Sequence, residues 1–147
     1  MPRPIEALIH TDALAHNLQR ARRAAPDARV WAVVKADAYG HGLTRVLPAL
    51  EAADGLALLE LDAAVALRER LYTRRVLLLE GFFEERELDE IAQRRLGIAI
   101  HHEEQVRMLE RATLVRPLEV FVKINTGMNR LGFPVARAAA ICERLAA

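Results

Sequence analysis

The stretch "VWAVVKADAYGHG", residues 30–42, places a lysine directly after five consecutive apolar residues. Apolar side chains at successive positions are typical of a strand that is covered on both faces, as in a parallel sheet. Lys35 therefore marks the carboxyl end of a predicted strand at 30–34, and parallel α/β proteins bind their ligands at this end of their strands. Gly40 and Gly42 predict a turn into the next helix in which the backbone comes close to a ligand.

A lysine at this place has two chemical interpretations. The charged form of an amine that is partly removed from water is disfavoured, and the neutral amine attacks carbonyl carbons, as a Schiff-base lysine must. Tyr39 would then offer its hydroxyl to an anion near the start of the next helix. The simpler interpretation is that Lys35 is solvated or paired with a carboxylate. Residues 30–42 taken alone leave both open.

Four more short apolar runs follow and alternate with amphipathic stretches. The predicted strands are "GLALL" (55–59), "VLLL" (76–79), "GIAI" (97–100) and "LEVFVKI" (118–124). The predicted helices have apolar residues three and four positions apart and span 43–53, 60–71, 84–96, 102–112 and a last stretch from about Pro134. This alternation predicts an α/β fold in which right-handed crossovers join parallel strands.

The segment before the first core strand carries its own signals. "IEALIH", residues 5–10, predicts a separate short strand. Thr11 or Asp12 is then expected to cap a helix that runs to about Ala25 and is ended by Pro26.

Two architectures accommodate these elements. One is a (β/α)8 barrel of TIM type, of which this chain would supply the N-terminal strand and helix and about the first five β/α units. The other is a flavodoxin-like, doubly wound sheet. Because an eight-unit barrel typically needs about 250 residues, a length of 147 favours the second architecture. The pattern of strands and helices does not decide between them.

Composition limits the kinds of binding partner and the cellular compartment that we expect for this protein. The 21 Lys and Arg residues balance 20 Asp and Glu residues, so charge gives no reason to expect binding to nucleic acid or to an anionic membrane. No apolar run approaches the roughly 20 residues that cross a bilayer, and the first ten residues do not resemble a signal peptide. The single cysteine, Cys142, is expected to fill a small apolar space. We therefore expect a cytoplasmic protein.

Other polar residues give weaker indications of a functional site. His101 and His102 are adjacent, and adjacent residues do not share one side of a strand or helix, so no metal site is expected. His41 lies between two glycines, where a structural hydrogen bond explains it at least as well as catalysis does. For Asp37 we expect no functional consequence.

Two motifs taken together identify a family. "AVVKADAYGHG" strongly resembles the pyridoxal-phosphate lysine motif of alanine racemases, and "FVKINTGMNRLGF" (121–133) resembles the motif that follows their fifth barrel strand. The resemblance extends through "IEALIHTDALAHNL" and "LLLEGFF", and so over essentially the whole chain. It implies the barrel architecture, a C-terminal β domain beyond this sequence and a homodimer.

The resemblance also implies roles for individual residues. Lys35 would hold pyridoxal 5'-phosphate covalently and act as acid or base on one face of the substrate α-carbon. Tyr39 matches a tyrosine that contacts the cofactor phosphate. Arg130 matches an arginine near the cofactor's phenolic oxygen and the substrate carboxylate, a task that suits a permanently charged, planar group. Lys123 matches a lysine that is carbamylated in many members, which would turn a cation into an anion able to orient Arg130.

The implied function is interconversion of L-alanine and D-alanine by the intact enzyme. Racemisation needs a second acid–base group on the other face of the substrate, and in the family that group is a tyrosine of the partner's C-terminal domain. Nothing in this sequence matches it, so we expect residues 1–147 to be the N-terminal part of the barrel domain and to be inactive alone. The alternatives are a broad-spectrum amino-acid racemase on the same scaffold and a non-catalytic pyridoxal-phosphate-binding protein. A flavodoxin-like binding module is a weaker fit.

Overall fold

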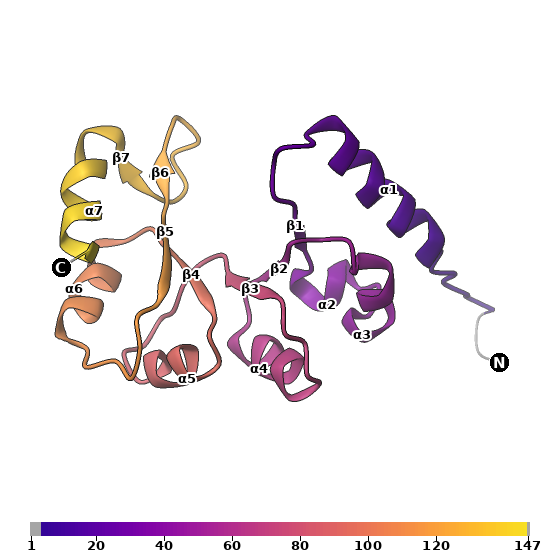
Figure 1. The fold of residues 1–147 in the computed structure, drawn as a ribbon, viewed down its shortest axis with the longest axis horizontal. Helices are drawn as coiled ribbons and strands as arrows, with labels where there is room; N and C mark the ends of the chain where they lie inside the picture. Colours follow the sequence, from indigo (N-terminus) through magenta and orange to yellow (C-terminus); the bar gives the residue numbers. More distant parts are fainter. Residues whose placement is uncertain (1–3, 147) are drawn as a thin grey trace.

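A computed structural model describes residues 4–146 and contains one five-stranded parallel sheet (Figure 1). Its strands are β1 (Trp31–Val33), β2 (Gly55–Leu58), β3 (Arg75–Leu78), β4 (Gly97–Ile100) and β5 (Glu119–Val122). They lie side by side in the order β1-β2-β3-β4-β5. Sequential order is that of a barrel, whereas a doubly wound sheet reverses its strand order at a switch point. The barrel-type α/β expectation is therefore confirmed, and the flavodoxin-like alternative is wrong.

Helices connect the strands and continue beyond the last of them. The helices and 3-10 turns are α1 (Thr11–Ala24), α2 (Lys35–Tyr39), α3 (Leu43–Val46), η1 (Leu47–Leu50), α4 (Leu61–Glu69), α5 (Glu87–Gln93), α6 (Glu103–Arg111), η2 (Val135–Arg137) and α7 (Ala138–Ala146). A second, two-stranded sheet pairs β6 (Ile124–Asn125) with β7 (Phe133–Pro134). Figure 1 shows α1 beside β1 at one end of the molecule and α7 beside β5 at the other. Within the described residues, no helix is long and apolar enough to cross a membrane.

The hydrophobic core lies between the sheet and its helices. Alternate strand residues are almost completely buried there and pack in one cluster with Leu67 of α4, Ile91 of α5 and Val106 of α6. These strand residues are Leu56, Leu58, Val76, Leu78, Ile98 and Ile100. Burying each such side chain stabilises the fold by about 1.5–3 kcal/mol, so this face fixes the register of the sheet.

The other face of the sheet carries a different set of side chains. Trp31 of β1 lies over Gly55 of β2, where an added Cβ would be 2.5 Å from the indole. Arg75 of β3 pairs with Glu119 of β5 at 3.1 Å. On the same face Trp31 of β1 also meets Phe121 of β5, with ring centroids 6.0 Å apart, so the two edge strands curve toward one another and this face is concave.

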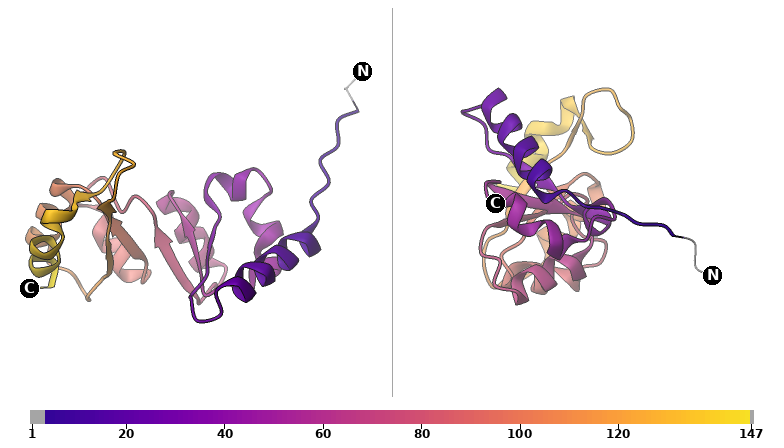
Figure 2. Two further views of the ribbon diagram at one scale, coloured as in Figure 1. Left: turned by 90° about the horizontal axis from the view of Figure 1, so that it is seen from above. Right: turned by 90° about the vertical axis from the view of Figure 1, so that its right-hand side faces the viewer.

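The predicted N-terminal strand is wrong. Residues 5–10 have no regular secondary structure, and Figure 2 shows them as an arm that extends away from the body. Ile5 is 82% and Leu8 is 71% exposed. A strand is stable only when a neighbouring strand accepts and donates its backbone hydrogen bonds, and no other described segment pairs with this one.

Two smaller expectations also fail. Helix α1 begins at Thr11, but neither Thr11 nor Asp12 caps it: His10 occupies the cap position and makes no side-chain cap bond. Cys142 is exposed and does not fill a core space. Its neighbour Ile141 takes the buried position on that turn of α7.

Candidate active site

Lys35 stands at the end of β1, where the chain makes an unusual turn. The ladder to β2 continues to the residue before it, since the Val34 amide donates to the Ala57 carbonyl at 2.8 Å. The next four residues, Ala36 to Tyr39, have φ angles of 51°, 51°, 55° and 55°. The segment α2 is therefore a left-handed turn, which residues with a Cβ rarely adopt consecutively. Lys35 is half-buried at its start, and Tyr39, 59% exposed, ends it.

Hydrogen bonds within the lysine motif hold this turn. The Ala38 amide donates to the Val34 carbonyl and the Gly40 amide to the Ala36 carbonyl, both at 2.9 Å. His41 Nδ1 lies 2.8 Å from the Ala38 carbonyl oxygen, and because a carbonyl only accepts, Nδ1 is the donor. The interpretation of His41 as a structural residue agrees with this bond.

Lys123 follows β5 at the same edge of the sheet. Its amide donates to the Ile100 carbonyl at 2.8 Å, and its carbonyl accepts from the Phe133 amide at 2.8 Å. The second bond joins β7 to the chain leaving β5, so the predicted strand 118–124 divides into β5 and β6 at Lys123. Phe133 is buried, which anchors the far end of the loop that follows Lys123.

Arg130 lies in that loop, which two asparagines organise. Asn125 Oδ1 accepts from the Gly127 amide at 3.0 Å and from the Asn129 amide at 3.1 Å, and the two side chains are bonded at 2.8 Å. Sequence reasoning missed this arrangement, although Asn-x-Gly is a signal of a side-chain-closed turn. Arg130 is exposed, and no described contact joins it to Lys35 or Lys123.

The two lysines follow the carboxyl ends of β1 and β5, the two edge strands of the sheet. The rings of Trp31 and Phe121 meet on the concave side of the sheet with centroids 6.0 Å apart. Side chains alternate along a strand, so Lys123, two residues after Phe121, projects toward the side of the sheet that carries this ring pair, whereas Lys35 follows Val34, whose ψ of 22° ends the extended backbone of β1. The fold thus brings Lys35, Tyr39 and Lys123 to the carboxyl edge, with the Arg130 loop directly after it.

Both amines remain free of carboxylates. Lys35 and Lys123 are the only lysines in the sequence, and neither takes part in any of the ion pairs formed by the described residues. Eight arginines, in contrast, are paired with carboxylates. Within the described residues Lys35 is thus not paired with a carboxylate, and the interpretation of Lys35 as a solvated residue is untested. A half-buried, unpaired amine is what a covalently attached carbonyl cofactor requires.

The histidines after β4 have structural partners. His102 Nδ1 accepts from the Glu104 amide at 3.2 Å and caps α6. His101 Nε2 lies 3.1 Å from the Glu80 carbonyl. Among residues 4–146, no three His, Cys, Asp or Glu side chains converge in a way that could hold a metal ion.

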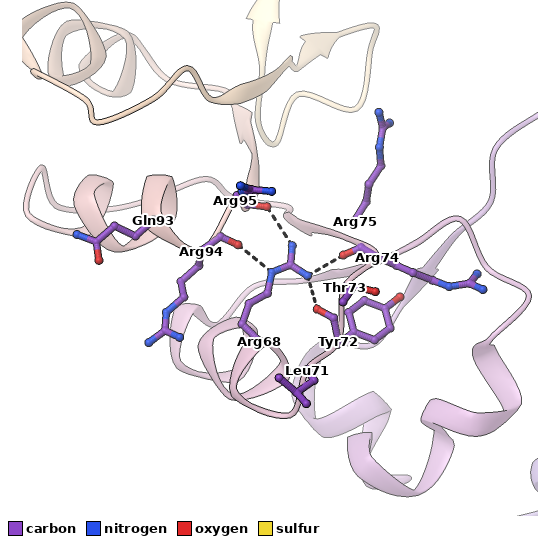
Figure 3. Close-up of a pocket in the computed structure, with 9 residues that line it drawn as sticks. All are labelled: Arg68, Leu71, Tyr72, Thr73, Arg74, Arg75, Gln93, Arg94 and Arg95. Carbon is purple, nitrogen blue, oxygen red and sulfur yellow. Dashed lines mark hydrogen bonds between the residues drawn. The ribbon is translucent and has the colours of Figure 1, made fainter.

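A cavity of about 510 Å³ lies at the opposite, amino-terminal end of the strands (Figure 3). Arg68 dominates it and donates four hydrogen bonds of 2.7–3.0 Å to backbone carbonyls. The acceptors are the carbonyls of Tyr72, Arg74, Arg94 and Arg95. Arg68 therefore joins the C-terminal ends of α4 and α5, and four of its five N–H donors are used by the backbone.

Comparisons with known proteins give the family of this site. Residues 9–147 match the family described as alanine racemase, N-terminal domain. An alanine racemase of Ralstonia pickettii is 58% identical over 144 residues, which are 98% of this chain and 38% of that protein.

Solved structures agree. The crystal structure of biosynthetic alanine racemase from Pseudomonas aeruginosa has a TM-score of 0.88 at 42% identity, covering 93% of this chain and 38% of that one. A histidine racemase from Leuconostoc mesenteroides has a TM-score of 0.80 at 26% identity, covering 91% of this chain and 37% of that one. The chain thus spans well under half the length of the proteins that it matches.

Proposed function

Because the chain belongs to the alanine racemase family, we propose that residues 1–147 form the N-terminal part of the barrel domain of an enzyme that interconverts L-alanine and D-alanine with pyridoxal phosphate. The observation that carries the proposal is the free amine of Lys35 at the end of β1, half-buried and held by a left-handed turn. Its motif and the Lys123–Arg130 motif stand at the same edge of the sheet, in the order that the resemblance requires.

Each of the four site residues has a defined role in this proposal. Lys35 would hold the cofactor covalently through Nζ, and its amine would take or return the proton on one face of the substrate α-carbon. Tyr39 donates its hydroxyl to the cofactor phosphate. Arg130 would lie near the cofactor's phenolic oxygen and the substrate carboxylate, and a carbamylated Lys123 would orient it. Bound pyridoxal phosphate supplies the electron sink that makes the α-proton removable.

The rest of the active site lies outside this sequence. We propose that the second acid–base group comes from a C-terminal domain of the partner subunit, so the intact enzyme is a homodimer and residues 1–147 alone do not racemise alanine. An alanine racemase in the cytoplasm would supply D-alanine for peptidoglycan. Detectable turnover by the purified chain would contradict this division of the site.

A second candidate is a racemase of broader specificity. The likeness to the histidine racemase of Leuconostoc mesenteroides favours it, because that protein places the same fold around a larger substrate. At 26% identity it is less similar to this chain than the Pseudomonas aeruginosa enzyme is, so alanine remains the first candidate. A non-catalytic pyridoxal-phosphate-binding protein is the third.

A chimera tests the proposal. Residues 1–147 replace the matching region of the Pseudomonas aeruginosa enzyme, and conversion of L-alanine to D-alanine is measured. We expect activity that falls by roughly a thousandfold or more in the Lys35→Arg chimera, which keeps the charge but not a primary amine. A folded chimera that binds pyridoxal phosphate without turnover would favour the non-catalytic candidate. Histidine turnover above that of the parent enzyme would trace broader specificity to residues 1–147.

A further inference from the structure

We propose that Asp37, with a smaller contribution from Glu60, is a positioning residue that fixes the direction in which Lys35 leaves the sheet. This inference rests on the proposed function of Lys35 and adds two carboxylates to which no role was expected. The observation behind it is the left-handed turn, together with the hydrogen bonds that the two carboxylates make to it.

The turn needs stabilising contacts from other residues because its backbone conformation is intrinsically unfavourable. Ala36, Asp37, Ala38 and Tyr39 all have positive φ, and none of them is glycine. In the left-handed conformation the Cβ of an L-residue crowds the following carbonyl oxygen, and asparagine and aspartate tolerate this best. Strained backbone of this kind persists only where the surrounding structure determines it, and it is concentrated at functional sites.

Asp37 closes the turn at its far side. Its Oδ1 accepts from the Leu43 amide at 2.7 Å, and its carbonyl accepts from the Gly42 amide at 3.0 Å. Leu43 is the first residue of α3. One residue therefore connects the middle of the left-handed turn to the start of the next helix and prevents the turn from relaxing.

Glu60 fixes the near side of the turn to the neighbouring strand. It follows the end of β2, and its Oε1 accepts from the Ala36 amide at 3.3 Å. Its Oε2 accepts from the Leu59 amide at 3.3 Å. Ala36 directly follows Lys35, so this contact ties the backbone at Lys35 to the end of β2. The two long bonds are weaker than the 2.7 Å bond of Asp37.

These contacts determine the direction of the Lys35 side chain and not its accessibility to solvent. The backbone conformation between Val34 and Ala36 sets the direction of the Lys35 Cα–Cβ bond. The carboxylates of Glu60 and Asp37 hold the backbone of the turn that directly follows Lys35. Reactions between bound groups are sensitive to displacements of about 1 Å. Loosening the turn should therefore leave the amine reachable from solvent but badly placed for a cofactor held at this edge of the sheet.

Substitutions separate the contributions of charge, hydrogen-bond acceptor and backbone conformation to the placement of Lys35. Asp37→Asn keeps an oxygen acceptor and tolerance of positive φ but removes the charge. Asp37→Gly keeps the left-handed conformation but removes the acceptor. Glu60→Ala removes the second contact from outside the turn, and Asp62→Asn, which removes an exposed carboxylate of α4, is the matched control.

The full chain and each variant are incubated with pyridoxal phosphate, reduced with borohydride and digested, and the label on Lys35 is expressed relative to Lys123. Acetylation by acetic anhydride measures the access of each amine in parallel, and circular dichroism verifies folding. We expect wild-type ratios for Asp37→Asn and Asp62→Asn. We expect a fall of about tenfold for Asp37→Gly and a smaller fall for Glu60→Ala, with unchanged acetylation of Lys35 in both.

Two failures are distinguishable. A wild-type chain that labels Lys35 no more than Lys123 would contradict the proposed function itself. A wild-type preference for Lys35 that Asp37→Gly retains in full would overturn only the positioning role. Should Asp37→Gly fail to fold, the same comparison is made with Glu60→Ala, whose substitution lies outside the turn.

Discussion

The indole of Trp31 meets the ring of Phe121 edge to face, with an interplanar angle of 87° and centroids 6.0 Å apart. The two residues belong to β1 and β5, which are the first and last strands of the sheet in sequence and in space. Their contact is thus made across the concave side, below the edge that carries Lys35 and Lys123. Edge-to-face aromatic pairs contribute about 0.5–1.5 kcal/mol beyond the area they bury, so this pair helps to keep the sheet curved.

The space for Trp31 depends on Gly55. In Gly55→Ala the new Cβ would lie 2.5 Å from Trp31 Cζ3 and 2.9 Å from the Arg75 carbonyl oxygen, and the backbone oxygen cannot move away easily. We expect a loss of about 1–3 kcal/mol in the free energy of unfolding and a shifted fluorescence spectrum of Trp31, the only tryptophan. Urea titration followed by fluorescence measures both.

Gly97→Ala is the control for this prediction. It lies on the same face of β4, but the nearest atom to an added Cβ is 3.5 Å away, an ordinary contact distance. We expect a change below about 1 kcal/mol and an unshifted spectrum. Equal effects of the two substitutions would contradict the placement of Trp31 over Gly55.

Arg68 should stabilise the fold through its geometry and not only through its charge. A lysine ammonium cannot reach the four carbonyls that the guanidinium bonds at 2.7–3.0 Å. We expect Arg68→Lys to lower the free energy of unfolding by about 2–4 kcal/mol. Arg86→Lys, at a side chain that is 81% exposed, should stay within about 0.5 kcal/mol. Equal losses of unfolding free energy for Arg68→Lys and Arg86→Lys in urea titrations would contradict this role of Arg68.

Gln105 holds together the loops that follow β3 and β4. It is only 5% exposed, and its amide donates to the carbonyls of Glu80 at 2.8 Å and Phe82 at 3.0 Å while accepting from the His101 amide at 3.0 Å. Gln105→Leu removes these three bonds and leaves the Phe82 carbonyl and the His101 amide without this partner, and we expect a loss of about 2–4 kcal/mol by urea unfolding. Gln93→Leu, at an exposed position of α5, should be nearly neutral.

Acid should weaken the connection between α1 and the sheet. The Val30 amide, at 2.7 Å, and secondarily the Arg22 guanidinium hold the pKa of Asp54 below its ordinary value of 3.8. A lowered folded-state pKa stabilises the protein above the ordinary value, and this contribution is lost as the pH falls through the lowered one. Asp54→Asn should therefore be less stable than wild type at pH 7 and closer to it near pH 3. A stability difference that is the same at both pH values in urea titrations would contradict this.

Much of the fold could be predicted from local pattern. The five core strands stand within one or two residues of the apolar runs, because strands that are covered on both faces carry long apolar runs. Their sequential order did not follow from the pattern, since five β/α units suit either architecture. The strand expected at 5–10 failed because a strand depends on a partner, which sequence alone does not supply.

The motif residues of the candidate site could be predicted from the sequence, but the residues that position them could not. Lys35, Tyr39, Lys123 and Arg130 belong to two motifs and could be named from them. The residues that hold these motifs in place could not, because Glu60 reaches Ala36 across 24 positions of sequence. Asp37 was set aside because its acceptor role depends on a left-handed turn that propensities argue against.

The most direct test of the account is the site at which pyridoxal phosphate becomes attached. The purified chain is treated with pyridoxal phosphate and borohydride, and the labelled peptides are mapped for wild type and for Lys35→Ala. With only two lysines in the sequence, the comparison is between Lys35 and Lys123. We predict label concentrated on Lys35 in the wild type, and no compensating increase at Lys123 when Lys35 is replaced. Equal labelling of both lysines, or transfer of the label to Lys123 in the variant, would contradict the central claim that the strand ends in lysine because its amine binds the cofactor.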